Sequence, residues 1–262
     1  MTDLHVLCDL DGVVWRGEQF LAGAVDTIAS LQRRRVSFWF ITNNSNLPPK
    51  IYAERLATAG VENPQVLTSA SAAATLVRPG DRCLIAGGLG VWRAVAEAGA
   101  IPISNEGPVE AKPPEVDSVI VGLHRNFDYA RLHRASSAVR NGAALIGTNS
   151  DLTFPTPDGE RPGGGALLRA IEAASGVTAV LAGKPHTPMA NLIRDRIGES
   201  FDADRCVMIG DRLSTDGRFA ERLACRFLWV SSGVAADEDE HPAIWRSSAS
   251  LGTSLDDLLE IV

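Results

Sequence analysis

Residues 4–12 read LHVLCDLDG, and this stretch decides how the chain folds. The apolar run Leu4–Cys8 has the length and composition of a buried strand, and Gly12 ends it. Side chains two apart in a strand point to the same side, so Asp9 and Asp11 are expected to present two carboxylates at one strand end. Because like charges held together need a cation or a shared proton, the pair predicts a divalent metal site, a carboxylate nucleophile, or both.

Two simpler interpretations of the same residues are open at this point. Asp and Gly are ordinary turn residues after a strand. The stretch also resembles the start of a calcium-binding loop, but Gly12 comes two positions too early for one. Phe20 and Leu21 stand where the closing glutamate of such a loop would fall. The rest of the chain has to distinguish a functional site from a turn.

The composition is that of an ordinary globular protein. The 262 residues, 45% hydrophobic and 22% charged, suffice for one large or two modest domains. A net charge of −7, with Arg33–Arg35 as the one basic cluster, argues against a nucleic-acid partner. We find no secretory signal and no apolar run of bilayer length, so no membrane partner is expected. The four cysteines are scattered without metal-ligand spacing, and we expect a cytoplasmic protein.

Strand-like and helix-like segments alternate along the chain, which predicts an α/β fold with a parallel sheet. The expected strands are Leu4–Cys8, Val36–Ile41, Arg82–Ala86, Ser118–Gly122, Ala143–Ile146, Val180–Ala182, Cys206–Ile209 and Phe227–Val230. The expected helices are Gly23–Arg34, Pro48–Ala59, Ser69–Val77, Gly90–Ala98, Asp128–Arg140, Ala166–Ala174, Pro188–Ile197 and Thr215–Leu223. The Pro- and Gly-rich segment 149–165 is expected to be a loop.

Three further polar motifs each follow one of the expected strands. They are Thr42-Asn43-Asn44-Ser45, Gly183-Lys184-Pro185 and the stretch 210–216, GDRLSTD. If these strands are parallel neighbours, all three motifs meet Asp9 and Asp11 at one edge of the sheet. That edge would hold four carboxylates, one ammonium, and several hydroxyl and amide groups.

This set of groups is what phosphoryl transfer requires, since catalysis there depends mostly on positioning and on charge stabilisation. Asp9, Asp211 and a main-chain carbonyl near Asp11 are oxygen ligands of the kind that magnesium binds. Thr42 and the amides after it can donate to a phosphate, and Lys184 can pair with its charge. A carboxylate can also attack phosphorus and form an aspartyl-phosphate.

The four motifs, in this order, resemble those of the haloacid dehalogenase-type phosphatase superfamily. The finer pattern is similar to its subfamily of p-nitrophenyl phosphatase-like, phosphoglycolate phosphatase-like and NagD-type enzymes. The stretches that carry this resemblance are 9–15, 42–45, 148–151, 154–156, 162–165 and 210–216. They span nearly the whole chain, and the subfamily therefore implies a Rossmann-like core with an inserted α/β cap of the C2 type.

The resemblance also implies a role for each matching residue. Asp9 would be the nucleophile and Asp11 the general acid and base. The phosphate and substrate would be held by Thr42, Asn43, Asn44 and Lys184. Magnesium would be bound by Asp9, Asp11 and Asp211, with Asp216 placed just outside the direct ligands. A homodimer is a further expectation at the level of the family.

The spacing of the motifs predicts where the cap lies in the sequence. About 140 residues separate Thr42 from Lys184, several times the roughly 30 that one strand-helix-strand unit needs. We therefore expect residues 79–179 to form an inserted cap domain over the catalytic edge, and residues 1–78 and 180–262 to form the core. A closing cap would exclude water from the reaction and select the substrate.

The sequence thus predicts a magnesium-dependent phosphomonoester hydrolase that acts through an aspartyl-phosphate on Asp9. The expected substrate is a small metabolite phosphate, such as phosphoglycolate, glycerol phosphate, a sugar phosphate or a nucleoside monophosphate. A non-catalytic phospho-acceptor module also uses Asp, Thr and Lys on a parallel sheet and is the first alternative. A phospho-metabolite-binding protein without catalysis is the second.

Overall fold

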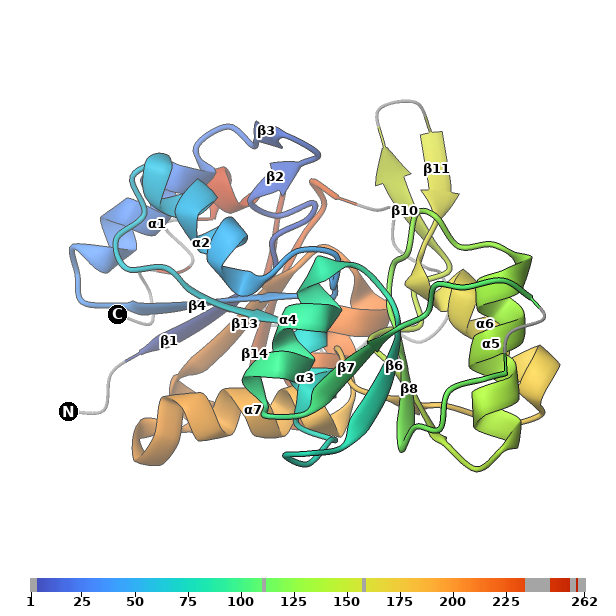
Figure 1. Ribbon diagram of the computed structural model, residues 1–262. Helices are drawn as coiled ribbons and strands as arrows, with labels where there is room; N and C mark the ends of the chain where they lie inside the picture. Colours follow the sequence, from blue (N-terminus) through green and yellow to red (C-terminus); the bar gives the residue numbers. More distant parts are fainter. Residues whose placement is uncertain (1–3, 110–111, 157–158, 234–245, 255–257, 259–262) are drawn as a thin grey trace. The chain divides into compact units, whose positions relative to one another are not determined.

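The structure is a computed structural model and describes residues 4–109, 112–156, 159–233, 246–254 and 258. The chain divides into two compact units (Figure 1). The first takes in Met1–Thr42, Lys50–Leu67 and Lys184–Val262, and the second takes in Asn43–Pro49 and Thr68–Gly183. The chain therefore passes between the units directly after Thr42 and directly before Lys184, two of the residues that the sequence singles out.

The first unit is built on a sheet of six described strands in the order β15-β14-β13-β1-β4-β5. Their bounds are β1 His5–Cys8, β4 Ser37–Thr42, β5 Gln65–Thr68, β13 Cys206–Gly210, β14 Arg226–Val230 and β15 Arg246–Ser248. Strand β1 lies between β13 and β4 and runs parallel to both. All four of its residues are buried, as expected for an apolar strand in the middle of a parallel sheet.

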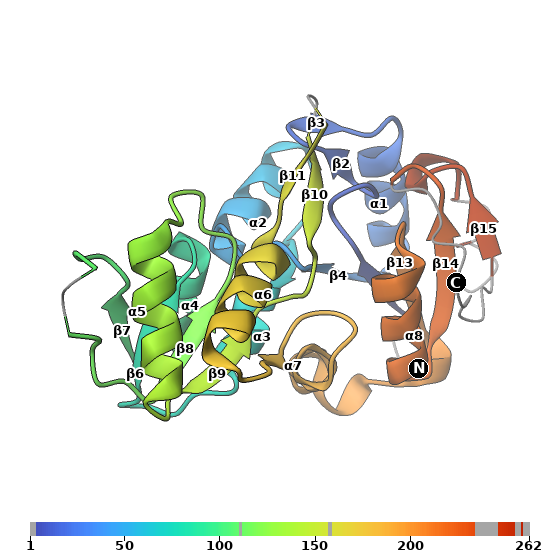
Figure 2. The ribbon, with the colours of Figure 1, turned by 90° about the vertical axis from the view of Figure 1, so that its right-hand side faces the viewer.

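Among the described residues, four helices belong mainly to this first unit: α1 Ala24–Gln32, α2 Pro49–Thr58, α7 Thr187–Ile197 and α8 Arg218–Leu223. Helix α1 packs on β4, whereas α8 packs on β13 and β14 (Figure 2). A short antiparallel hairpin joins β2 Trp15–Arg16 to β3 Gln19–Phe20. Single turns complete the unit: η1 Gly198–Ser200, η2 Ala203–Arg205, the π-helical turn η3 Leu213–Gly217, and η4 Leu251–Thr253.

The second unit has its own parallel sheet, in the order β12-β9-β8-β6-β7. Its strands are β6 Arg82–Ala86, β7 Ile101–Ser104, β8 Ser118–Val121, β9 Ala144–Gly147 and β12 Val180–Leu181. Its helices are α3 Ser69–Ala74, α4 Leu89–Glu97, α5 Tyr129–Arg140 and α6 Gly164–Ser175. Helices α5 and α6 pack together and on β8, and they bury an apolar cluster of alanine, valine and leucine side chains. An antiparallel hairpin, β10 Thr153–Thr156 and β11 Gly159–Pro162, precedes α6.

The predicted α/β fold with parallel sheets is confirmed, but several elements differ from expectation. Val180–Ala182 was expected beside the other motif-bearing strands, yet β12 pairs with β9 in the second sheet. The expected loop 149–165 contains the β10–β11 hairpin, whose prolines hide the strand pattern. Strand β7 carries Pro102 at the edge of its sheet, where a missing donor is tolerated, and it was not predicted either.

The second unit is also wider than the predicted insertion of residues 79–179, since it includes 43–49, 68–78 and 180–183. Helix α3 packs against α4, and β12 extends the second sheet, so both segments belong with the inserted chain. In the described part of the chain, no helix combines the length and the hydropathy that a bilayer crossing requires.

Candidate active site

The parallel pairing of β1 with β4 and β13 brings three motifs of the first unit to one sheet edge. Cys8, the last residue of β1, lies opposite Phe40 and Ile209 in the neighbouring strands. The main-chain N–H of Asp9 donates to the carbonyl of Ile209 at 2.9 Å, which continues the ladder one residue further. The residues that follow each strand therefore emerge side by side, as the sequence predicted for these three strands.

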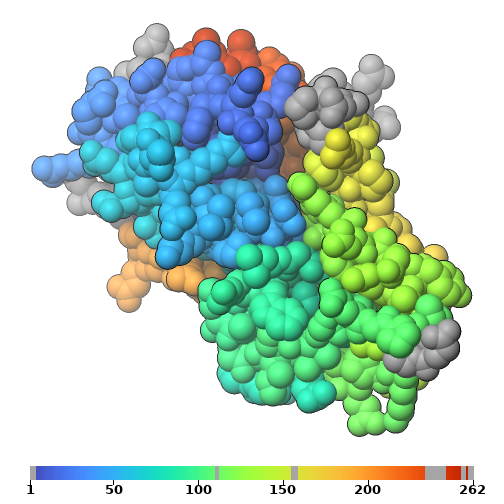
Figure 3. Space-filling model, turned by 45° about the horizontal axis from the view of Figure 1, so that its top comes forward, coloured from blue at the N-terminus to red at the C-terminus, as the bar shows by residue number. Residues whose placement is uncertain are grey.

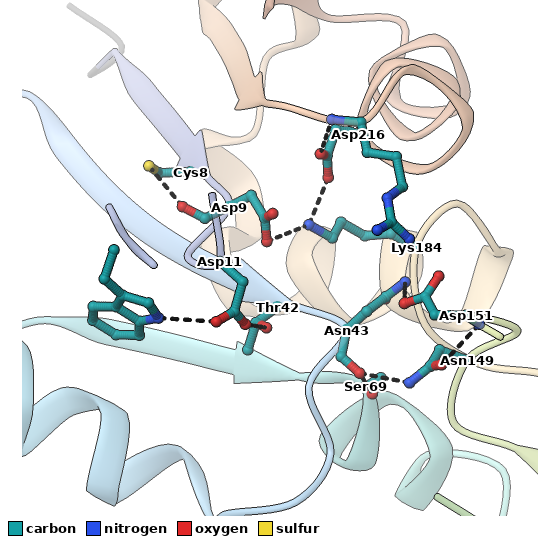
Figure 4. Close-up of polar contacts among 12 residues, drawn as sticks. Cys8, Asp9, Asp11, Thr42, Asn43, Ser69, Asn149, Asp151, Lys184 and Asp216 are labelled. Atoms are coloured by element: carbon teal, nitrogen blue, oxygen red, sulfur yellow. Dashed lines mark hydrogen bonds and ion pairs between the residues drawn. The ribbon is translucent and has the colours of Figure 1, made fainter. Parts of the chain in front are cut away.

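Lys184 links two buried carboxylates at this edge (Figure 4). Its Nζ lies 2.8 Å from Oδ1 of Asp9 and 2.6 Å from Oδ1 of Asp216. Only 2% of Lys184 is exposed. Burial alone would lower the pKa of this ammonium, but the carboxylates of Asp216 and Asp9 outweigh burial and raise the pKa. Lys184 is therefore a fixed positive charge between two acids.

For Asp9, the effect of burial on the pKa outweighs that of its charged partner Lys184. Burial raises the pKa of its carboxyl group well above the ordinary value, and the ammonium of Lys184 works against this rise. The negative charges of Asp216 and Asp211 raise the pKa of Asp9 further. The carboxylate of Asp9 thus sits in an environment with more negative than positive charge.

The turn after β13 places Asp216 at this site. The stretch that starts at Arg212 closes into the π-helical turn η3, and the main-chain N–H of Arg212 donates to Oδ2 of Asp216 at 3.1 Å. With Oδ1 bound to Lys184, both oxygens of this fully buried carboxylate are engaged. Any Cβ at Gly210 would collide with the Asp216 carboxylate, so the last position of β13 has room for glycine alone.

The donor set at this edge fits a divalent cation. Among the described residues, Asp9, Asp211 and Asp216 each offer a carboxylate oxygen, and these oxygens lie within 4.8 Å of one another. The ammonium of Lys184 compensates one of these three negative charges, and a divalent cation would compensate the other two. Carboxylate oxygens are the ligands that magnesium and calcium prefer. Because Asp216 is already engaged on both oxygens, Asp9 and Asp211 are the better candidates for direct ligands.

Asp211 is held in place by close backbone packing. Its side chain is 4% exposed and lies against Gly12 and Gly233, where a Cβ at either position would overlap its carboxylate. Gly12 also has a φ of +89°, a conformation that other residues rarely adopt. The indole N–H of Trp229 donates to the main-chain carbonyl of Asp211 at 3.0 Å.

Asp11 does not join this acidic cluster, although it stands two residues from Asp9. Its Oδ1 accepts a hydrogen bond of 3.1 Å from the indole Nε1 of Trp15, and its Oδ2 lies 3.4 Å from the hydroxyl Oγ1 of Thr42 (Figure 4). The carboxylate is exposed, in contrast to that of Asp9. The predicted metal contact through the main-chain carbonyl of Asp11 stays a prediction.

In the second unit, the motif at 148–151 holds the segment that follows Thr42. The main-chain carbonyl of Asn43 accepts hydrogen bonds from Ser69 Oγ at 2.6 Å and from Asn149 Nδ2 at 2.7 Å. Asn149 Oδ1 in turn accepts from the main-chain N–H of Asp151 at 3.0 Å, and Nδ2 of Asn43 lies 3.4 Å from the Asp151 carboxylate. The sequence analysis identified this motif as part of the resemblance but predicted no role for it. The structure shows that it holds the main chain and the side chain of Asn43 in place.

The neighbouring residues 44 and 45 are held in the same way. Oδ1 of Asn44 accepts from the main-chain N–H of Asn46 at 3.1 Å, which closes a tight turn. The hydroxyl of Thr148 donates to that of Ser45 at 3.1 Å. The predicted roles of Asn43 and Asn44 in binding phosphate stay predictions.

Comparisons with known proteins place the chain in a family. Residues 6–101 match the model of the haloacid dehalogenase-like hydrolases, and residues 181–258 match a related HAD-hydrolase-like model. An acid sugar phosphatase of Staphylococcus saprophyticus is 32% identical over 240 residues, which cover 89% of this chain and 88% of that protein.

Solved structures give the same result. The glycerol phosphate phosphatase of Mycobacterium tuberculosis, in complex with calcium, superposes with a TM-score of 0.82 at 30% identity, covering 96% of this chain and 74% of that one. The 4-nitrophenylphosphatase of Thermotoga maritima superposes with a TM-score of 0.83 at 26% identity and covers 97% of both chains. The α/β fold of this chain is thus shared with these phosphatases.

The chain belongs to the haloacid dehalogenase-like hydrolase family. Within that family its neighbours are of the NagD and p-nitrophenyl phosphatase type, as the sequence motifs predicted.

Proposed function

We propose that this protein is a magnesium-dependent phosphomonoester hydrolase that acts on a small metabolite phosphate through an aspartyl-phosphate on Asp9. The observation that carries the proposal is the buried ammonium of Lys184, held between Asp9 and Asp216 at the edge of the core sheet. A buried cation beside a nucleophilic carboxylate is suited to a substrate whose charge lies on phosphoryl oxygens. The relatives named as phosphatases support the same reaction.

In the first step, a carboxylate oxygen of Asp9 attacks phosphorus while the bond from phosphorus to the leaving oxygen breaks. Asp11 gives its proton to that leaving oxygen, which departs as an alcohol. In the second step, Asp11 takes a proton from a water molecule that attacks the phosphorus of the aspartyl-phosphate, while the bond between phosphorus and the Asp9 oxygen breaks. Inorganic phosphate then leaves, and both carboxyl groups return to their starting states.

The remaining polar groups of the first unit stabilise charge during both steps. Lys184 pairs with a phosphoryl oxygen while it holds Asp9 in place, and the hydroxyl of Thr42 donates to the phosphate. Asp9 and Asp211 would hold magnesium. When bound, this cation supplies positive charge that offsets the negative charge of the phosphate. Asp216 keeps Lys184 oriented, with its second oxygen fixed by the main chain of Arg212.

The names of the relatives support the proposed substrate class. Their names refer to sugar phosphate, glycerol phosphate and nitrophenyl phosphate, which share a phosphomonoester and little else. The residues proposed to act are those that touch the phosphoryl group, and they do not depend on the alcohol. A screen of phosphorylated metabolites with the purified protein would identify the alcohol.

Steady release of inorganic phosphate from p-nitrophenyl phosphate tests the reaction. We expect turnover with magnesium, loss of turnover in a chelator, and no turnover in Asp9→Asn. Asp26→Asn, at an exposed aspartate of α1, is a matched control and should keep full activity. Full activity in Asp9→Asn, or activity that a chelator leaves unchanged, would contradict the proposal.

The same preparation separates the hydrolase from a phospho-acceptor module. A hydrolase forms the phosphoaspartate and breaks it down in each cycle, so its phosphoenzyme decays within seconds once substrate is removed. If mass spectrometry after acid quenching instead shows a phosphoaspartate that persists for minutes without turnover, the acceptor module is the better description.

A further inference from the structure

The turn after β1 folds back so that Trp15 lies beside Asp11. The main-chain N–H groups of Val14 and Trp15 both donate to the carbonyl of Leu10, at 2.9 and 3.1 Å. The N–H of Gly12 donates to the carbonyl of Trp15 at 2.7 Å, which closes the turn from the other side. The backbone therefore fixes the distance between Asp11 and Trp15 independently of their side chains.

The side chain of Trp15 is directed at Asp11 from a buried position. Only 1% of Trp15 is exposed, and its Nε1 donates to Oδ1 of Asp11 at 3.1 Å (Figure 4). Asp11 itself is exposed, and its other oxygen, Oδ2, lies 3.4 Å from the hydroxyl Oγ1 of Thr42. The indole N–H is thus a fixed donor that holds a carboxylate at the surface.

Three neighbours hold the indole ring. Phe20 meets it edge-on with the ring centroids 5.6 Å apart, and Tyr52 stacks on it at 6.3 Å. The guanidinium of Arg55 lies 4.1 Å from the centroid of the indole. A cation over the face of an indole is attracted by the ring, so Arg55 helps to hold the indole in place.

Arg55 also fixes the hairpin that carries Trp15. Its Nη2 donates to the main-chain carbonyl of Gly17, in the turn between β2 and β3, at 3.0 Å. Helix α2, which carries Arg55 and Tyr52, is therefore tied to the hairpin by a hydrogen bond and by ring contacts. The lighter-blue α2 segment and the dark-blue hairpin segment adjoin on the face in Figure 3.

We propose that Trp15 is a positioning residue for Asp11: its indole N–H holds the carboxyl group in the orientation from which it protonates the leaving oxygen. Arg55 supports this by fixing the indole and the hairpin. This inference rests on the proposed function, because the role of Asp11 as the acid belongs to that proposal.

The proposal predicts a dependence on the leaving group. An alkyl phosphate such as glycerol phosphate releases a basic alkoxide and needs the proton of Asp11 in the transition state. p-Nitrophenyl phosphate releases a stable phenolate and needs that proton far less. Loss of the Trp15 N–H should therefore slow the alkyl substrate more than the aryl substrate. Loss of packing alone would lower the folded fraction and slow both substrates equally.

The test compares kcat/KM for the two substrates in Trp15→Phe, which keeps an aromatic ring but has no N–H donor. One hydrogen bond to a charged group corresponds to about a tenfold loss, so we expect about tenfold for the alkyl phosphate and less than about threefold for p-nitrophenyl phosphate. A second variant replaces Trp15 by benzothienylalanine, which keeps the size of the indole and carries sulfur in place of the N–H. It should show the same selective loss.

Two further variants make each outcome decisive. Phe38→Leu disturbs a different aromatic pair of the first unit, that of Phe38 with Phe40, and it should leave the ratio of the two kcat/KM values unchanged. Asp11→Asn should show a selective loss at least as large as that of Trp15→Phe. If Asp11→Asn is selective but both Trp15 variants slow the two substrates equally, the positioning role is overturned while the proposed function stands. If Asp11→Asn is itself unselective, the acid role fails and the inference fails with it.

Discussion

Replacing Lys184 by methionine tests the electrostatics of the site most directly. The substitution keeps much of the side-chain volume but removes the ammonium that lies 2.8 Å from Asp9 and 2.6 Å from Asp216. Both carboxylates would stay buried without this partner. Removal of one member of a buried ion pair costs about 3–5 kcal/mol, so we expect Lys184→Met to lower the free energy of unfolding by about that amount at neutral pH.

The loss should depend on pH with a definite sign. In the wild type, Lys184 has a raised pKa, so its stabilising contribution is complete below its ordinary pKa and disappears only as the pH rises through the raised value. Burial already holds the pKa of Asp9 above its ordinary value, and removing Lys184 takes away the main opposing influence. The folded variant therefore binds a proton on Asp9 more tightly than the unfolded chain does. The difference from the wild type should shrink as the pH falls from neutral toward about 4.

Urea denaturation in a chelator measures this difference without a contribution from metal binding. Lys50→Met is the matched control, since Lys50 forms an exposed ion pair with Glu54 and should leave the midpoint unchanged. Adding Asp216→Asn to Lys184→Met should restore about 1–3 kcal/mol, because it removes one of the two uncompensated charges. A loss below about 1 kcal/mol, or a loss that stays constant with pH, would refute this account of the site.

Three further predictions concern single residues. Gly233→Ala places a Cβ into the Asp211 carboxylate and should raise the magnesium concentration for half-maximal activity by at least about tenfold, measured by titration, without lowering the free energy of unfolding by more than about 2 kcal/mol. Asn149→Ala removes one of the two donors to the carbonyl of Asn43 and should lower the free energy of unfolding by about 1 kcal/mol, whereas equal stability would show that Ser69 suffices. Burial raises the pKa of the Cys8 thiol well above its ordinary value, so alkylating reagents at mildly alkaline pH should label Cys8 only after unfolding, as mass spectrometry can check.

The sequence predicted the fold best where buried strands are uninterrupted apolar runs. Such runs mark β1, β4 and β13, and the motifs after them emerge together because neighbouring parallel strands end at one sheet edge. The prediction failed where pairing depends on partners that are distant in the chain. Val180–Leu181 is too short to show which sheet it joins, and its pairing with β9 is a tertiary choice that no local pattern encodes.

For the site too, the sequence predicted what depends on local patterns but not what depends on contacts between residues that are distant in the chain. The residues that follow strands could be predicted, since strand ends set their positions. The ion pair of Lys184 with Asp216 joins residues 32 positions apart, and it depends on the π-helical turn after β13. The bond from Asn149 to the carbonyl of Asn43 spans 106 positions. A sequence pattern can identify the residues that take part in such contacts. Which of them bond to one another is seen only in the folded structure.

Asp9 and Asp11 show most clearly what the fold adds to the pattern. Strand alternation predicted two carboxylates on one side, yet β1 ends at Cys8, and the turn at Gly12 directs Asp11 toward Trp15. Asp9 faces the ammonium of Lys184 from a buried position, whereas Asp11 is exposed and accepts from a neutral indole. Two carboxyl groups in different surroundings can take different parts in one reaction. The turn at Gly12 therefore gives the proposed nucleophile and the proposed acid different surroundings, and the Trp15 variants test whether those of Asp11 set its orientation.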